Sequence, residues 1–237
     1  MVQQRFDNLP PERREQIFAA AASEFAERGY EAASVNRILD RAGLSKGSLY
    51  YYFEDKADLF STLLDRALAR MVKAAGGFSL DELTADTYWT RLEQLVRRSS
   101  DFLSRHDWAV QLVRAFFRMG GSPDEPRATG RLHRSARRWT EAVIAKGQAL
   151  GVLRADLPLA FLAEIALALG EAGDRWLVEH WDELSPAERE RFVAGEMDLF
   201  RRMLTPHAGQ PEHGDARRAR VRARRAGGSP GIDGSVD

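Results

Sequence analysis

Hydrophobic residues recur along this chain three and four positions apart, which is the spacing of one face of an amphipathic helix. Ile17, Ala21 and Phe25 follow this spacing and predict a first helix. It should run over about residues 11–28 and end at Gly29, because glycine accepts the positive φ of a helix terminus. Stretches that alternate polar and apolar residues are short, and no Asn-Gly hairpin signal occurs. The pattern therefore predicts an all-α fold.

Two short helices are predicted next, over residues 34–42 and 45–53, with Gly43 breaking the chain between them. Ser34 and Ser45 are expected to cap their first turns. Two short helices joined by a glycine-containing turn have the dimensions of a helix-turn-helix motif.

The rest of the chain is predicted to form longer helices joined by connectors that carry glycine, proline or a capping residue. These helices are expected over residues 55–75, 81–105, 107–119, 127–150, 158–181 and 185–204. Beyond residue 204 almost no large apolar side chain remains, so residues 206–237 are predicted to be a disordered, arginine-rich tail. Its arginines are expected either to be solvated or to add nonspecific phosphate contacts.

Composition narrows the class of protein. The 237 residues include 35 Lys and Arg, 35 Asp and Glu, and no cysteine, which excludes disulfides and thiolate metal sites. No signal-peptide segment is visible, and no apolar run reaches the about 20 residues that cross a membrane. We therefore expect a cytoplasmic protein without a membrane partner. The five histidines have no metal-binding or catalytic spacing, so no catalytic residue, metal or cofactor is expected.

The third helix carries tyrosines on its outer face. On a helical wheel, Leu49 and Phe53 face the core, and Leu44 precedes them in the turn. The outward positions are Gly47, Ser48 and Tyr51, with Lys46, Tyr50 and Tyr52 on the flanks. A tyrosine ring can contact a thymine methyl group, and its hydroxyl can reach a phosphate or a base edge. The alternative is that these rings pack against neighbouring helices with their hydroxyls at the rim.

Residues 11–66 resemble the TetR family of bacterial transcription regulators, most specifically in the stretch AGLSKGSLYYYFEDKADLF. The resemblance implies that helix 34–42 supports the third helix, that residues 45–52 enter the major groove, and that Ser34 and Lys56 hold phosphates. The candidate DNA contacts are Ser34, Arg37, Ser45, Lys46, Gly47, Ser48, Tyr50, Tyr51, Tyr52 and Lys56. The predicted domains are a DNA-binding domain over residues 1–56 and a helical ligand-binding and dimerisation domain over 57–205.

The charge of the predicted DNA-binding domain is unusual. Residues 1–56 hold eight Lys and Arg against nine Asp and Glu, a net charge of minus one, whereas DNA-binding domains are usually basic. We therefore expect modest affinity for each monomer and a need for two linked heads.

Helix 158–181 is apolar on nearly every side, which is typical of a helix enclosed between two layers. Its small residues form a seam that suits close helix packing, and the last helix has an apolar side. These features favour a homodimer joined by a four-helix bundle, with a monomeric core as the alternative. The candidate interface residues are Ala163, Ala166, Gly170, Gly173, Trp176, Phe192, Leu199, Phe200 and Met203.

The middle helices are rich in aromatic rings, which either pack the core or line the small-molecule pocket that the resemblance implies. The candidates for that pocket are Trp89, Phe102, Trp108, Phe116, Phe117, Trp139, Phe161 and Glu164. Glu164 belongs to an acidic stripe with Glu171 and Asp174, which either faces solvent, pairs with arginines such as Arg137, or recognises a cationic or hydroxylated ligand.

The sequence thus predicts a ligand-responsive transcriptional regulator, most simply a repressor, that binds a palindromic operator in double-stranded DNA as a homodimer and is released by a small-molecule effector. The alternative is a helical small-molecule-binding or protein-interaction module whose DNA head is not functional. An enzyme would need a catalytic constellation that the sequence does not display.

Overall fold

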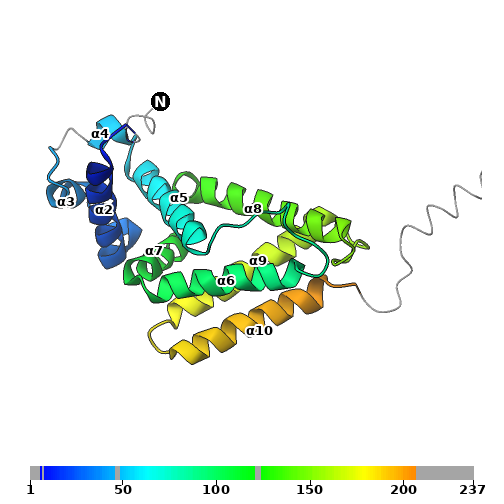
Figure 1. Ribbon diagram of the computed structural model, residues 1–237. Helices are drawn as coiled ribbons and strands as arrows, with labels where there is room; N and C mark the ends of the chain where they lie inside the picture. The colour runs from blue at the N-terminus through cyan, green and yellow to red at the C-terminus, as the bar shows by residue number, and fades with distance from the viewer. Residues whose placement is uncertain (1–5, 7, 46–48, 121–123, 207–237) are drawn as a thin grey trace, which may run out of the picture.

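A computed structural model describes residue 6 and residues 8–45, 49–120 and 124–206 of the chain, and all regular elements in this part are helices, as predicted (Figure 1). The helices are α2 (Pro11–Ala32), α3 (Val35–Arg41), α4 (Leu49–Tyr52), α5 (Lys56–Ala74), α6 (Tyr88–Ser104), α7 (Asp107–Arg118), α8 (Glu125–Ala149), α9 (Leu159–Glu179) and α10 (Pro186–Leu204). The predicted tail lies outside the described residues except for Pro206.

Two of the described helices begin at a side-chain cap. Asp55 accepts a hydrogen bond from the Asp58 amide at the start of α5, and Ser185 forms a capping box with Glu188 at the start of α10. Gly29 adopts a φ of 68° as predicted, but the helix resumes after this kink and ends at Ala32. Ser34 occupies the N-cap position of α3 without making a side-chain capping bond, so that part of the prediction is wrong.

One long helix is shorter than predicted. The helix expected over residues 81–105 begins only at Tyr88. Each of Thr84 and Thr87 accepts a hydrogen bond from the other's backbone amide through its hydroxyl, which stabilises a turn in place of the first helical turns.

The molecule has a head, formed by α2, α3 and α4, which α5 connects to a larger helical body (Figure 1). The head core includes Phe25, Ile38 and Phe60, and it continues into the body through Leu112 on α7 and Ala128 on α8. Helix α2 packs most extensively against α7. The predicted domain division at residue 56 stays a prediction, because one core runs across it.

The body core lies among α6, α8, α9 and α10 and includes Tyr88, Ile144, Leu162 and Ala163. Helix α9 packs against α7, α8 and α10, but it is not enclosed on all sides as predicted, because Phe161 and Trp176 on its outer face are 48% and 41% exposed. None of the described helices is both long and apolar enough to cross a membrane.

Candidate nucleic-acid interface

The turn that follows α3 is held by backbone contacts at Gly43 and Leu44. Gly43 adopts a φ of 61°, which glycine tolerates without strain, and the Leu44 amide donates to the Leu39 carbonyl at 2.9 Å. Residues Lys46, Gly47 and Ser48, which are predicted DNA contacts, lie outside the described residues.

The two sides of α4 differ as the helical wheel predicts. Phe53, directly after α4, is 1% exposed, and its ring centroid lies 4.9 Å from that of Phe6. Tyr51 is 54% exposed on the opposite side. Tyr52 is half-buried, with its ring edge-on to Phe6 and Tyr51, so it supports the position of Tyr51 rather than pointing fully outward. Tyr50 lies in α4, and Ser45 is exposed at the end of the turn.

An arginine on α2 holds the end of α3. Arg13 donates from Nη1 to the Ala42 carbonyl at 2.9 Å and from Nη2 to the Gly43 carbonyl at 2.7 Å. These two bonds satisfy carbonyl groups that the end of a helix leaves without partners. Arg13 was not among the predicted functional residues, because its partners lie about thirty positions away along the chain.

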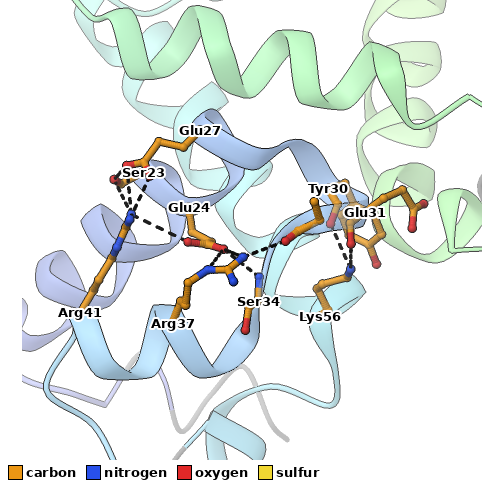
Figure 2. A network of polar contacts seen from close by, with 10 residues as sticks. Ser23, Glu24, Glu27, Tyr30, Glu31, Ser34, Arg37, Arg41 and Lys56 are labelled. Carbon is orange, nitrogen blue, oxygen red and sulfur yellow. Dashed lines mark hydrogen bonds and ion pairs between the residues drawn. The ribbon is translucent and has the colours of Figure 1, made fainter.

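A second set of polar contacts joins α2 to the start of α3 (Figure 2). Glu24 on α2 is fully buried, and its Oε1 accepts hydrogen bonds from the Ser34 amide at 2.9 Å and from Arg37 Nε at 2.7 Å. Burial by itself raises the pKa of Glu24, but the hydrogen bonds and charge of Arg37, with the Ser34 amide and Arg41, outweigh it and lower the pKa. The carboxylate is therefore ionised at neutral pH.

Lys56 caps the end of α2. Its Nζ donates to the Tyr30 carbonyl at 3.0 Å and to the Glu31 carbonyl at 3.2 Å, and it lies 4.4 Å from the centre of the Tyr30 ring (Figure 2). An ammonium group has three N–H donors, so one donor is left for a phosphate. Replacing Lys56 would also remove a structural bond, which makes it a poor residue for testing DNA contact alone.

Comparison with known proteins identifies this head. Residues 17–63 match the family model described as bacterial regulatory proteins, tetR family. The transcriptional repressor AcnR of Corynebacterium efficiens is 30% identical over 156 residues, which cover 65% of this chain and 75% of AcnR. The chain belongs to the TetR family of transcriptional regulators. The transcriptional activator FasR of Mycolicibacterium smegmatis is 36% identical over 110 residues, and the matched part spans about half of FasR, 49% of its length.

Solved structures show the same fold over most of the chain. The fatty acid degradation regulator FadR of Bacillus halodurans superposes with a TM-score of 0.65 at 19% identity, covering 79% of this chain and 97% of FadR. FadR of Bacillus subtilis, in complex with stearoyl-CoA, gives a TM-score of 0.62 at 16% identity, covering 78% of this chain and 96% of that protein.

Several acidic side chains of this TetR head are paired with arginines. Glu24, which is buried, pairs with Arg37, while the exposed Glu27 pairs with Arg41 at 2.9 Å and the exposed Glu15 pairs with Arg70. The hydrogen bond from Arg41 lowers the pKa of Glu27 to about 2.

The aromatic residues predicted to line a ligand pocket do not surround one cavity. Trp139 and Phe161 are 44% and 48% exposed, while Trp89 packs edge-on to Tyr88 in the body core. Phe102 and Trp108 contact each other beside α2, and Phe116 and Phe117 contact each other at the end of α7. Among the described residues, one open groove of about 250 Å³ lies between α8 and α9, and another of about 360 Å³ lies among α2, α5 and α7.

Glu164 lines the groove between α8 and α9, together with His133, Arg137 and Glu171. Its carboxylate lies 3.6 Å from Arg137 Nη1, and its side chain is 60% exposed. This agrees with the prediction of a solvent-facing residue paired with an arginine.

The predicted dimer surface needs a correction. Ala163 and Ala166 are 0% and 7% exposed within the chain's own core, so a second chain cannot reach them. Gly170 approaches the Phe200 ring on α10, so the seam of small residues permits close packing of α9 and α10 within one chain. Phe200 and Met203 are partly buried against the body core.

An apolar strip remains at least partly exposed on α9 and α10, and it consists of Trp176, Phe192 and Leu199. Trp176 is 41% exposed and Leu199 is 54% exposed. The Phe192 ring stacks on Trp176, with a distance of 4.7 Å between ring centroids. Of the predicted interface residues, these three are the ones still suited to contact a second chain.

Proposed function

We propose that this chain regulates transcription by binding double-stranded DNA through α4 and that it is most simply a repressor. The observation that carries the proposal is Tyr51, a large aromatic side chain that is 54% exposed on the short helix α4. A major groove about 12 Å wide accommodates a helix, and an exposed ring on that helix can reach base edges.

In this proposal the residues of the head have different tasks. Tyr51, Tyr50 and the predicted contacts Lys46, Gly47 and Ser48 face bases, and Tyr52 orients Tyr51. Phosphates are contacted by Ser34, Ser45, Arg37 and Lys56. Phosphate contacts set position and affinity, whereas base contacts set sequence preference.

Two chains are needed to bind one operator. Residues 1–56 carry a net charge of minus one, so one head alone gives weak binding. The exposed strip of Trp176, Phe192 and Leu199 is proposed to pack against the same strip of a second chain. Two α4 helices set about 34 Å apart would then read a palindromic site.

A small-molecule effector is proposed to control this binding through α7. Helix α7 contacts the head through Trp108, which lies edge-on to Phe18 on α2 at 5.6 Å. At its other end Arg114 donates to the Val178 carbonyl of α9 at 2.6 Å and to Asp182 at 2.9 Å. A ligand that displaces α7 would therefore move the head relative to the body, with a coupling energy of about 1–3 kcal/mol.

The proposal is tested by isolating bound duplexes from a random-sequence pool and measuring their affinity. Tyr51→Ala should weaken binding to the isolated duplex by about 1–3 kcal/mol and reduce its preference over unrelated DNA. Trp139→Ala is the matched control, because Trp139 is similarly exposed but lies on the body. Recovery of no duplex would favour the alternative, a helical small-molecule-binding or protein-interaction module.

A further inference from the structure

Glu24 is a charged side chain that is buried in the head. It lies on α2 and is 0% exposed, among side chains that otherwise form the apolar core of the head. A buried charge is unfavourable unless hydrogen bonds and opposite charges compensate for it.

The compensation comes mainly from one residue of α3. Arg37 Nε and Nη2 lie 2.7 and 2.6 Å from Glu24 Oε1, and Nη2 also donates to the Ala32 carbonyl at 2.8 Å (Figure 2). The second carboxylate oxygen of Glu24 accepts no hydrogen bond from the residues that the structure describes, and Arg41 Nη1 lies 3.9 Å from it. The guanidinium of Arg37 is therefore held from one edge.

The other edge of Arg37 is not occupied. Its Nη1 has no acceptor within the described part of the chain, and its side chain is 46% exposed. A guanidinium presents donors in a rigid planar fork, so fixing Nε and Nη2 also fixes the direction of Nη1.

We propose that Glu24 is a positioning residue for DNA binding, which holds Arg37 so that Nη1 can donate to a backbone phosphate. This inference rests on the proposed DNA-binding function. A free arginine loses rotamer freedom when it binds a phosphate, and an arginine already held by Glu24 does not lose it at that moment. The lowered pKa of Glu24 keeps the holding charge in place at neutral pH.

Neutralising Glu24 should change the affinity for DNA in the direction opposite to the one that simple electrostatics predicts. If Glu24 were only a negative charge near DNA, its neutralisation would tighten binding, because repulsion of phosphates would fall. If Glu24 positions Arg37, its neutralisation weakens binding although the head becomes more positive.

The test compares Glu24→Gln, Arg37→Gln and the double variant in the full-length chain. Glutamine keeps the size of Glu24 and an oxygen that can accept from the Ser34 amide. Glu27→Gln is the matched control, since it removes the same charge from the same helix but leaves Arg37 in place. The probes are a duplex that the wild-type chain isolates from a random pool and an unrelated duplex of equal length, each titrated over a range of salt concentrations.

Arg37→Gln should weaken binding to both duplexes about tenfold and make the salt slope shallower by about 0.9 for each bound head. Glu24→Gln should weaken binding to both duplexes by an intermediate factor, leaving the preference between them unchanged. In the Arg37→Gln background the same change should have no effect or tighten binding. Glu27→Gln should not weaken binding.

Other results overturn the inference in recognisable ways. If the wild-type chain binds the duplexes and Glu24→Gln binds them equally well or more tightly, Glu24 does not position Arg37 for DNA binding. Glu24→Gln could also weaken binding in the Arg37→Gln background, or reduce the preference for the isolated duplex. Either result would show that Glu24 only maintains the fold of the head. If the wild-type chain isolates no duplex and binds neither probe, the proposed function itself fails and the inference falls with it.

Discussion

Glu196 on α10 provides a prediction with a defined sign and size. Its Oε1 is buried without a hydrogen-bond donor in the described part of the chain, and it lies so close to Gly173 that a Cβ there would be 1.9 Å away. Burial and, to a smaller extent, the nearby Asp174 carboxylate raise the pKa of Glu196 from 4.5 to about 7. Replacing Glu196 with Gln removes the charge while keeping the shape of the side chain.

The size of the effect on the free energy of unfolding follows from the pKa values of Glu196 in the unfolded and folded chain. Each pKa unit corresponds to about 1.4 kcal/mol, so the ionised carboxylate destabilises the folded chain by at most about 3 kcal/mol above pH 7. Below pH 4.5 the group is protonated in both folded and unfolded chains, and the effect disappears. Between these limits the folded chain binds the proton more tightly, so wild-type stability should fall as pH rises.

The assay is urea unfolding followed by helical circular dichroism at a series of pH values and one protein concentration. Glu196→Gln should be more stable than wild type by about 2–3 kcal/mol at pH 8, with the difference closing toward pH 4.5. Glu190→Gln, which changes an exposed carboxylate of the same helix, should show no such difference. Equal stability of Glu196→Gln and wild type at pH 8, or a difference that does not depend on pH, would refute the reasoning.

Three further changes test other contacts. Arg13→Ala should lower stability by about 1–2 kcal/mol in urea unfolding and weaken DNA binding, because the turn at Gly43 loses its support. Leu199→Arg should shift the chain to monomers in analytical ultracentrifugation if the exposed strip joins two chains. Tyr30→Phe should lower stability by about 1 kcal/mol, because the hydroxyl donates to Asp124 at 2.9 Å between head and body; unchanged unfolding would contradict this.

The pattern of the sequence predicted the turn of the head and the two sides of α4, but not the helix bounds, since neither Ser45 nor Phe53 is helical. Gly43 marks the turn because few other residues adopt its positive φ, and the helical wheel correctly separates buried Phe53 from exposed Tyr51. These features are local, so they depend on residues that are close together along the chain.

Contacts between distant residues were not predictable in the same way. Helical spacing puts Glu24 on the buried face of α2, seven positions after Ile17, and a carboxylate at such a position signals a buried partner. It does not identify Arg37 as that partner, because this depends on how α3 packs on α2. The small residues at Ala163 and Ala166 likewise indicate close helix packing without indicating whether the neighbouring helix belongs to the same chain.

The most direct test of the account is to isolate duplexes from a random pool with the full-length chain, sequence them, and measure how many chains bind each one. The account predicts a shared site of two half-sites related by a dyad, about one helical turn apart or a multiple of it, occupied by at least two chains. Recovery of no enriched sequence, or of a single half-site bound by one chain, would contradict it.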